Sequence, residues 1–391
     1  MMSADRRIVF RWGASSYFGW GIYGLNLMLH WPQPALTAEP IDRIVLTRED
    51  QRRRIAELIT ASEQMHEKLA AYAGQTVVAQ VPVFICYGNN LERSYGIHGI
   101  DLFGTPSIGF VFLDQTTIAQ AHVEQVNQLA QMVAGSSWNA TVLAQAGVKR
   151  VVTVLQGVDC ELFRPRPKSG RFADRFVIFS GGKAEWRKAQ DIVLLAFRIF
   201  AERHPDALLM TAWQSPYRGP QTFSGSAALP PAPLRPDGGL DAALWASQTG
   251  IAAHQFLDIG MLPNSELPAI LADADAALFP NRAEGGTNLV AMECLASGIP
   301  TILSANTGHL DLIERTQTFA AMRQRPVTRS GGSSVAGWGE SDIEELIELL
   351  EAIYDRPEDA RARAARAADA MLKLSWEGQI RELHSVLSPL L

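Results

Sequence analysis

Short apolar runs alternate with longer amphipathic stretches along almost the whole chain. Runs such as "VFICYG" near residue 83 and "SIGFVFL" near residue 107 predict strands, whereas "QRRRIAELITASEQMHEKLAAYA" repeats apolar residues every three or four positions and predicts a helix. Strands that alternate with helices form parallel sheets, because each crossover helix returns the chain to the same edge. The alternation therefore predicts an α/β fold.

The alternation stops once, at "DCELFRPRPKSGRFADR", where prolines, glycine and charges are typical of a linker between domains. Strands are expected before it at "RIVFRW", "RIVLT" and "TVVAQ", and after it at "RFVIFSG", "ALLMTAW", "AALFP" and "PTILS". We expect an N-terminal Rossmann-like domain over 1–165 and a second over 166–370. A C-terminal helix over 371–391 is expected to cross back to the first domain.

Three other segments carry specific expectations. "VEQVNQLAQMVAGSSWNATVLAQAG" predicts a helix, a short polar turn that begins at Ser136, and a second helix. "ESDIEELIELLEAIYDRPEDARARAARAADAMLKL" predicts one long helix. Residues 214–240, rich in Pro, Gly and Ser, predict a surface loop or lid.

Composition limits the class of protein. The net charge of −6 argues against a nucleic-acid binder, which would show a basic stripe. The run Arg52, Arg53 and Arg54 predicts a solvated helix face, and peripheral membrane contact is the alternative. Three widely spaced cysteines suit a reducing compartment, and no apolar run approaches the roughly 20 residues that span a bilayer. With no signal-peptide pattern, we expect a cytoplasmic protein, with membrane association left open.

The segment "GWGIYG" formally matches the dinucleotide-binding pattern GxGxxG, with Gly19 and Gly21 as its first two glycines. Such glycines let backbone amides approach a diphosphate. The match is weak because about seven residues separate it from the preceding strand, and Glu49 does not directly follow the second strand. Glycines that ease a helix against a sheet are an equally good interpretation.

A second segment, "FSGGKAEWRKAQD", gathers cations where a predicted strand meets a helix. Gly182 would permit close approach of a ligand, and Lys183, Arg187 and Lys188 would suit a diphosphate. The alternative is an exposed basic loop in which Lys183 and Arg187 balance Glu185. The segment is not a P-loop, because GxxxxGK followed by Ser or Thr is absent.

The third segment is "EGGTNLVAMECLASGIP", which predicts a short helix after a loop. Either Thr287 or Asn288 is expected to cap a helix that runs from Leu289 to Ser297, and Gly298 fits the position after its end. The amides at this N-terminus would point into the crevice beyond the strand ends and would suit phosphate oxygens.

Two acids flank that N-terminus. Glu293 lies one turn into the helix and would accept hydrogen bonds from paired ribose hydroxyls, while Glu284 precedes the helix and would meet a group beyond the phosphates. Taken singly, each acid is better explained as a solvated side chain. Taken together with the amides between them, they describe a nucleotide-sugar site.

At this point the chain resembles a known family. The block "GMLPNSELPAILADADAALFPNRAEGGTNLVAMECLASGIPTI" resembles the donor-binding region of family 4 glycosyltransferases, which are retaining enzymes with the GT-B fold of two facing Rossmann-like domains. "FSGGKAEWRKAQDIVLLAF", "SSWNATVLAQAGVKRVVTVLQGVDCELFRP" and "SYFGWGIYGLNLMLH" resemble other parts of that family in the right order. The resemblance covers most of the chain.

The resemblance implies roles for individual residues. Lys188 matches the lysine at the donor diphosphate, and Lys183 stands where an arginine is usual. Glu293 matches the ribose-binding glutamate, and Glu284 matches the glutamate that touches the donor sugar. Backbone amides for the diphosphate are implied at the helix start: Asn288 and Leu289.

The chain also departs from the family pattern. Eight residues, rather than the usual seven, separate Glu284 from Glu293, and Ala189 replaces the usual glycine after Lys188. A histidine that faces the transferred sugar in many relatives has no clear equivalent in the first domain. Polar candidates for its place, or for contact with the acceptor, are Asp114, Thr116, His98, Asn89, Asn90 and Glu92.

The sequence thus predicts a retaining glycosyltransferase that moves a sugar from a nucleotide diphosphate sugar to an unidentified saccharide, lipid-linked or protein acceptor. We expect no metal and no cofactor, because no DxD-type cluster ends a strand and the cations would stabilise the leaving diphosphate. Two alternatives are a non-catalytic nucleotide-sugar-binding protein and, through "GWGIYG", an NAD-dependent dehydrogenase.

Overall fold

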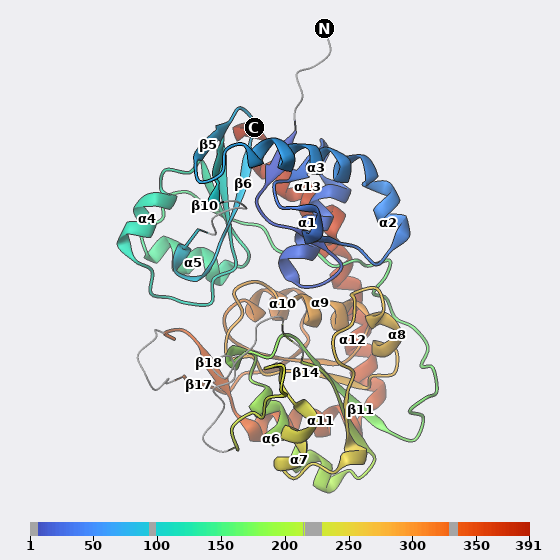
Figure 1. Ribbon diagram of the computed structural model, residues 1–391. Coiled ribbons are helices and arrows are strands. Elements are labelled where there is room, and N and C mark those ends of the chain that lie inside the picture. The colour runs from blue at the N-terminus through green and yellow to red at the C-terminus, as the bar shows by residue number, and fades with distance from the viewer. Residues whose placement is uncertain (1–6, 94–98, 214, 216–228, 328–334) are drawn as a thin grey trace. The chain divides into compact units, whose positions relative to one another are not determined.

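The computed structural model describes residues 7–93, 99–213, 215, 229–327 and 335–391. It confirms the α/β prediction, since the chain contains two six-stranded sheets whose paired strands are all parallel. Two compact units contain these sheets (Figure 1). The N-terminal unit comprises Met1–Gly157, Pro263–Ser265 and Leu374–Leu391, and the C-terminal unit comprises Val158–Leu262 and Glu266–Lys373.

The large sheet of the N-terminal unit has the strand order β10-β9-β8-β6-β1-β3. Its strands are β1 (Ile8–Phe10), β3 (Ala35–Thr37), β6 (Val83–Tyr87), β8 (Ser107–Val111), β9 (Gln131–Ala134) and β10 (Val151–Thr153). Two small parallel pairs accompany it: β2 (Ala14–Ser15) with β4 (Ile44–Val45), and β5 (Thr76–Ala79) with β7 (Asp101–Gly104). The order reverses between β1 and β6, which is the topological switch point of this sheet.

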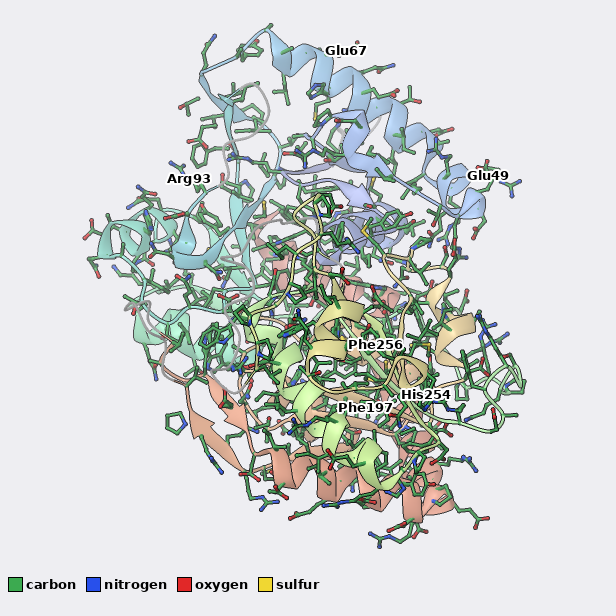
Figure 2. All side chains as sticks on the ribbon, turned by 60° about the horizontal axis from the view of Figure 1, so that its bottom comes forward. Glu49, Glu67, Arg93, Phe197, His254 and Phe256 are labelled. Atoms are coloured by element: carbon green, nitrogen blue, oxygen red, sulfur yellow. The ribbon has the colours of Figure 1, made fainter. Side chains whose placement is uncertain are left out.

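Among the described residues of the N-terminal unit there are six α-helices: α1 (Gly19–His30), α2 (Glu49–Arg54), α3 (Ala56–Ala70), α4 (Gln120–Val126), α5 (Ser137–Gln145) and α13 (Trp376–Leu387). The C-terminal helix α13 packs on α1, with the Tyr23 and Trp376 rings 5.4 Å apart. The charged side chains of α2 and α3 project outward, Glu49 and Glu67 among them (Figure 2), and Arg52, Arg53 and Arg54 are exposed as a solvated face would be.

Several predicted elements of this unit are wrong. "QMVA" forms the buried strand β9 between α4 and α5, where the helical pattern had predicted a continuous helix up to Ser136. "RIVLT" contributes only the two-residue strand β4, while β1 pairs with β6 on one side and, on the other, with β3, which was not predicted. Strands of three or four residues are too short to show a period, so burial in the sheet decides their structure.

The C-terminal sheet has the order β13-β12-β11-β14-β15-β16. Its strands are β11 (Phe176–Gly181), β12 (Ala207–Ala212), β13 (Phe256–Asp258), β14 (Ala276–Phe279), β15 (Thr301–Ser304) and β16 (Phe319–Ala321). Counted from β11, this is the Rossmann order 3-2-1-4-5-6, with its switch point between β11 and β14. An antiparallel hairpin follows, made of β17 (Gln324–Pro326) and β18 (Gly339–Ser341).

The helices of this unit are α6 (Gln190–Arg203), α7 (Ala242–Gln248), α8 (Leu267–Leu271), α9 (Leu289–Ala296), α10 (His309–Thr316), α11 (Ile343–Asp355) and α12 (Pro357–Met371). Its core joins strand and helix side chains, including Phe197 on α6 and, at its margin, Phe256 on β13 (Figure 2). The predicted single C-terminal helix is two helices, because Pro357 cannot continue α11 and instead begins α12.

Within the described ranges, no helix combines the length and the apolar character needed to cross a bilayer. The predicted loop over 214–240 lies largely outside the described residues; its described end pairs Leu234 with Leu240 in a short antiparallel bridge. Ligands of doubly wound sheets bind beyond the carboxyl ends of the strands at the switch point, so the segments after β11 and β14 are where a site is expected.

Candidate functional site

The segment after β11 places a lysine over a glycine. Gly182 has a φ of 119°, a conformation that favours glycine, and a Cβ atom built on it would lie 3.7 Å from Cδ and Cε of Lys188. Residues Trp186–Lys188 form a 3₁₀ turn before α6. The Lys188 side chain therefore lies against Gly182 at the end of β11, and the positive φ of Gly182, rather than lack of space for a Cβ atom, favours glycine there.

Ala189 stands where the family pattern has glycine, and its backbone conformation is one that glycine favours. It has φ 57° and ψ 40°, the left-handed conformation, and is the residue from which α6 begins. The family has glycine here, and glycine adopts this conformation without the steric penalty of a Cβ atom. The chain thus keeps the backbone shape while it replaces the residue that favours it.

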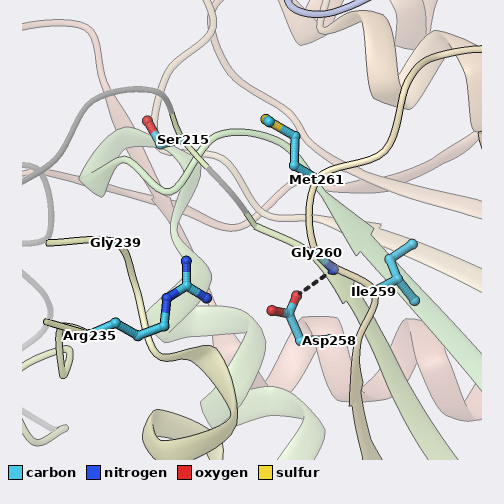
Figure 3. A pocket seen from close by; sticks show the side chains of 7 residues that line it. All are labelled: Ser215, Arg235, Gly239, Asp258, Ile259, Gly260 and Met261. Atoms are coloured by element: carbon cyan, nitrogen blue, oxygen red, sulfur yellow. Dashed lines mark hydrogen bonds between the residues drawn. The ribbon is translucent and has the colours of Figure 1, made fainter. Parts of the chain in front are cut away.

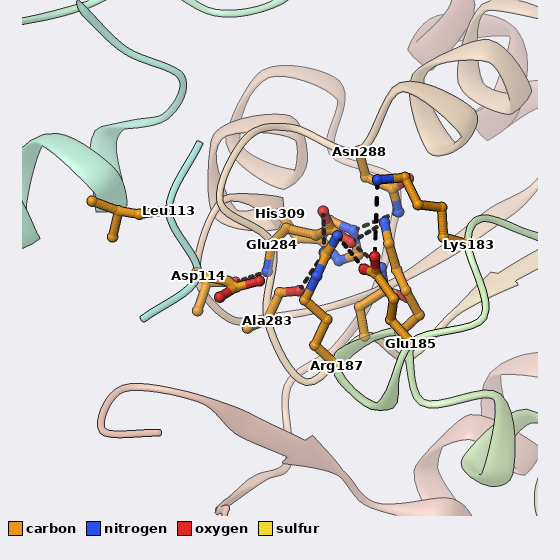
Figure 4. Close-up of polar contacts among 12 residues, drawn as sticks. Leu113, Asp114, Lys183, Glu185, Arg187, Ala283, Glu284, Asn288 and His309 are labelled. Carbon is orange, nitrogen blue, oxygen red and sulfur yellow. Dashed lines mark hydrogen bonds and ion pairs between the residues drawn. The ribbon is translucent and has the colours of Figure 1, made fainter. Parts of the chain in front are cut away.

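The segment after β14 carries Glu284, whose carboxylate is surrounded by donors (Figure 4). Lys188 Nζ and Asn281 Nδ2 both donate to Oε1, and Arg187 Nη1 lies 3.2 Å from Oε2. The Glu284 amide donates to Thr307 Oγ1 at 2.8 Å, and its carbonyl accepts from the Gly308 amide at 3.0 Å. The fold therefore brings Glu284 and Lys188 together from the two strands of the switch point.

These contacts decide the charge of the site. Burial would raise the pKa of Glu284, but the Lys188 and Arg187 cations outweigh it and lower that pKa to about 2. Burial lowers the pKa of Lys188, and the carboxylate of Glu284 opposes that shift. Lys183 and Arg187 also contact Glu185, at 3.8 and 2.7 Å, as the basic-loop alternative had predicted. The cluster holds three cations and two carboxylates, an excess of one positive charge.

The helix N-terminus next to this cluster is not capped as predicted. Helix α9 begins at Leu289 as expected, but Asn288 is left-handed (φ 64°) and makes no side-chain capping hydrogen bond. The Thr287 hydroxyl contacts Met292 Sδ at 2.9 Å instead. The end of the helix agrees better, because Gly298 has a φ of 72° after the last turn. A helix N-terminus without a side-chain cap retains amide donors for a ligand.

Both acids are buried, which contradicts the interpretation of either as a solvated side chain. Glu284 is 4% exposed and Glu293 is 5% exposed. Glu293 lies in the second turn of α9, beyond the N-terminus that Glu284 precedes. The structure brings Lys188, Arg187 and Glu284 into one cluster beside the N-terminus of α9. Glu293 lies farther along α9, in its second turn.

Sequence reasoning missed Arg282, which ties these segments together. Its guanidinium is 1% exposed, forms two hydrogen bonds with Asp191 (2.9 and 2.7 Å), and contacts Glu340 of β18 at 2.8 Å. It also donates to the Trp186 carbonyl and lies over the Trp186 ring. The only sequence signal was its place between a strand end and Glu284. Asn281, Thr307 and His309 were also missed, because their partners are distant in sequence.

In the N-terminal unit, the "GWGIYG" glycines lie within or at the start of α1. A Cβ atom on Gly21 would lie 2.6 Å from Ser15 Cβ, and one on Gly24 would lie 2.3 Å from the Gly13 carbonyl oxygen. Both are packing contacts, and Gly19 is the first residue of the helix. Glu49 begins helix α2, four residues after the end of β4, so it does not directly follow a strand as the acid of the dinucleotide pattern should, and the tight turn of that pattern is also missing before α1.

Two of the polar candidates in the N-terminal unit, Asn89 and Asn90, form hydrogen bonds with the backbone of the loop between β8 and α4. Asn89 Oδ1 accepts from the Asp114 amide at 2.9 Å, and Asn90 Oδ1 accepts from the Ala119 amide at 2.7 Å. His122 contacts the Asn90 carbonyl at 2.6 Å. His98 lies outside the described residues.

A pocket of about 420 Å³ lies at the carboxyl ends of β12 and β13 (Figure 3). It is lined by Ser215, Arg235, Gly239, Asp258, Ile259, Gly260 and Met261. The Asp258 carboxylate accepts from the Thr211 hydroxyl at 3.1 Å and from the Gly260 amide at 3.4 Å. Because β12 is the direct neighbour of β11, this pocket opens on the same edge of the sheet as the Glu284 cluster.

Comparison with known proteins bears on the fold and on the C-terminal part of the chain. Residues 263–383 match the family described as "Family 4 Glycosyltransferase in conflict systems". No curated protein sequence matches the chain. Among solved structures, sucrose-phosphate synthase from Thermosynechococcus elongatus is 13% identical with a TM-score of 0.60, over 98% of this chain and 99% of that one.

Two further structures are similar over their whole length. Anabaena HepE in complex with UDP-glucose is 16% identical with a TM-score of 0.62, covering 98% of this chain and 99% of that one. A glycosyltransferase from Rickettsia africae is 11% identical with a TM-score of 0.60, covering 99% of both chains.

At these identities the solved structures establish the fold, which is that of the GT-B glycosyltransferases. The family match lies in the C-terminal half of the chain and includes Glu284, Asn288 and Glu293. The comparisons thus show the GT-B fold over the chain and a family 4 glycosyltransferase match over residues 263–383, both as the resemblance in the sequence predicted.

Proposed function

We propose that the protein transfers a sugar from a nucleotide diphosphate sugar to an acceptor hydroxyl, with retention at the anomeric carbon and without a metal ion. The observation that supports this most is the buried cluster of Lys188, Arg187 and Glu284 at the switch point of the C-terminal sheet, beside the N-terminus of α9. Titratable groups with strongly shifted pKa values at such a position are typical of functional sites.

The cations and the helix would bind the diphosphate. In the transfer, the bond between the anomeric carbon and the diphosphate oxygen would break and negative charge would grow on that oxygen, while the acceptor hydroxyl oxygen would bond to the anomeric carbon and its proton would pass to the departing diphosphate. Lys188, Lys183 and the amides of Asn288 and Leu289 would stabilise this charge, the role that a divalent metal plays elsewhere. Lys188 and Arg187 now contact Glu284, so a diphosphate would replace that carboxylate as their partner.

The remaining parts of the donor would be bound on either side of the diphosphate. Glu293, buried in α9, would accept hydrogen bonds from the ribose hydroxyls, and Glu284, released from the cations, would contact the transferred sugar. The pocket beyond β12 and β13 would accommodate the base on the same edge of the sheet. Because HepE is described in complex with UDP-glucose, UDP-glucose is the first donor to test.

The N-terminal unit would bind the acceptor, and a saccharide, a lipid-linked or a protein acceptor all fit the proposal. Retention follows from the family resemblance. We place the protein in the cytoplasm, with peripheral membrane contact left open.

A two-stage experiment tests the donor site. A thermal-shift screen with UDP-, GDP- and TDP-sugars would identify the donor, because a ligand that binds only the folded state raises its apparent stability. Release of nucleoside diphosphate from that donor would then separate a transferase from a non-catalytic binding protein, which would bind without release.

Glu293→Ala is expected to weaken donor binding about tenfold or more, because it removes an acceptor for the ribose hydroxyls. Glu344→Ala, which removes an exposed acid on α11, is the matched control. Unchanged donor affinity in Glu293→Ala would show that the ribose assignment is wrong.

A further inference from the structure

We propose that His309 is a positioning residue that holds the Asn288 side chain, and through it the N-terminus of α9, in place for the donor diphosphate. The proposal rests on the proposed donor site and adds to it a residue that neither the sequence pattern nor the resemblance indicated. His309 is the first residue of α10, is fully buried, and contacts Asn288 Nδ2 through Nε2 at 3.1 Å.

A chain of hydrogen bonds fixes the proton on the imidazole. Ser304 Oγ lies 2.7 Å from the Asn281 carbonyl, which only accepts, so the Ser304 hydroxyl must donate its single proton there. The other contact of Ser304 Oγ, with His309 Nδ1 at 3.0 Å, then requires Nδ1 to carry the proton. In the neutral ring, Nε2 is left as an acceptor, and the Asn288 amide donates to it.

The surroundings keep this ring neutral. Burial lowers the pKa of His309 to about 4, and the nearby Lys188 and Arg187 cations act in the same direction, while the Glu284 carboxylate opposes them. A second proton on Nε2 would face the amino group of Asn288, so the contact exists only with the neutral ring. The chain of bonds ends at Asn281, whose own amide donates to Glu284. One imidazole therefore links the helix N-terminus to the acid of the cluster.

Asn288 needs such support because its backbone is left-handed, with φ 64° and ψ 88°. Asparagine tolerates this conformation better than most residues, but it remains less favourable than the ordinary helical one. The bond to His309 holds the side chain of Asn288 in place. The backbone of Asn288 in turn would orient the first amides of α9 toward the expected diphosphate. Loss of that bond would leave these amides less well oriented, with no change in the charges of the site.

Two substitutions at His309 separate positioning from simple packing. His309→Gln keeps an acceptor near the position of Nε2, and His309→Asn keeps a donor near Nδ1 but loses the acceptor. His309→Asn should weaken binding of the nucleoside diphosphate about tenfold, while His309→Gln should stay within about threefold of the wild type. Asn288→Gly, which permits the left-handed backbone and keeps the backbone amide but removes the side-chain amide, should weaken binding as much as His309→Asn.

The measurement is titration calorimetry with the nucleoside diphosphate of the identified donor, with urea denaturation of each variant as the check on folding. If the two residues act through one bond, His309→Asn combined with Asn288→Gly should cost no more than either change alone. Additive losses, or equal losses in His309→Gln and His309→Asn, would overturn the proposal while leaving the donor site intact. Absence of binding by the wild type would overturn the donor site and this inference with it.

The tautomer can be tested without any ligand. Nitrogen NMR of the ¹⁵N-histidine-labelled protein distinguishes a protonated ring nitrogen from an unprotonated one. We expect His309 to show a protonated Nδ1 and an unprotonated Nε2 at neutral pH. A proton on Nε2 would contradict the assignment.

Discussion

The two parallel sheets have similar layouts but very different carboxyl edges. At the switch point of the C-terminal sheet, the segments after β11 and β14 bring together Lys188, Arg187 and Glu284. At the switch point of the N-terminal sheet, Arg11 after β1 is bound within the unit by Asp101 at 3.1 Å and by the Leu102 carbonyl at 2.9 Å. Trp12 follows it in an aromatic group.

That aromatic group comprises Phe10, Trp12, Trp20, Tyr23, Phe110 and Phe112, whose neighbouring ring centroids lie 4.8 to 6.4 Å apart. The glycines of "GWGIYG" serve the packing of α1 in this region. Both sheets have a topological switch point, but among the described residues the C-terminal edge carries the charged cluster of Lys188, Arg187 and Glu284, whereas the N-terminal edge carries a bound arginine and packed aromatic rings.

The largest effect is expected from Lys188→Ala. It removes the central cation of the cluster, so donor turnover should fall about 100-fold or more, as for other preorganised groups that stabilise developing charge. It also leaves Glu284 buried with fewer partners, which should cost about 3 kcal/mol of unfolding free energy. Steady-state kinetics and urea denaturation measure the two effects.

The double variant Lys188→Ala with Glu284→Gln separates function from folding. It removes both charges of the pair, so most of the lost stability should return while turnover stays low. Lys68→Ala, an exposed lysine on α3, is the control. If Lys188→Ala changed turnover and stability no more than Lys68→Ala does, the functional difference proposed between the two sheet edges would be contradicted.

Gly24→Ala tests the other edge. The added Cβ atom would meet the Gly13 carbonyl oxygen, so we expect a loss of about 1–3 kcal/mol of stability and no change in donor affinity of the folded protein. Gly88→Ala, where the nearest atom would lie 3.7 Å away, is the matched control and should be nearly neutral. A specific loss of donor affinity in Gly24→Ala would instead assign ligand contact to the N-terminal glycines.

Acid should destabilise the C-terminal unit through His309. Its pKa falls from 6.5 to about 4 on folding, so below pH 6.5 the unfolded chain binds a proton that the folded protein does not. Stability should therefore decrease as the pH falls from 6.5 to 4, by up to about 3 kcal/mol from this residue. Glu284 acts differently, because its stabilisation is present above its unfolded pKa of 4.5 and is lost only as the pH falls toward about 2.

Urea denaturation of the wild type and His309→Gln at pH 4, 5, 6 and 7 measures this dependence. The variant should lose less stability over this range than the wild type. Parallel curves for the two proteins would show that the imidazole is not kept neutral by the fold.

The smallest effect is expected from Ala189→Gly. Glycine adopts the left-handed conformation of this residue more readily, but it also has more freedom in the unfolded chain, so the net gain should be only about 0.5 kcal/mol. Thermal unfolding measures it, and Ala184→Gly, a buried alanine in the same loop, should destabilise instead. A loss of stability in Ala189→Gly would show that packing of the Ala189 methyl group contributes more to the free energy of unfolding than the strain of its left-handed backbone removes.

The alternation of elements and the site segments were predictable from the sequence, because each depends on local patterns. The start of α9 at Leu289 and the left-handed Gly298 follow from such signals. The short strands β3 and β9 were not predictable, since three or four residues show no period and pairing in the sheet decides them.

Long-range contacts were also beyond the sequence. The bond between Lys188 and Glu284 joins residues 96 positions apart, and Arg282 meets Asp191 across 91. The left-handed conformation of Asn288 and its contact with His309 replaced the predicted side-chain cap, because a buried partner from α10 outcompeted the local one.

The central claim is that the carboxyl edge of the C-terminal sheet binds the donor. Photo-crosslinking with an azido derivative of the identified nucleotide sugar, followed by peptide mapping, tests it most directly. We predict labelled peptides from the C-terminal unit, within residues 181–309, and loss of the label in Lys188→Ala. Labelling confined to residues 8–30, around β1 and "GWGIYG", would contradict the account.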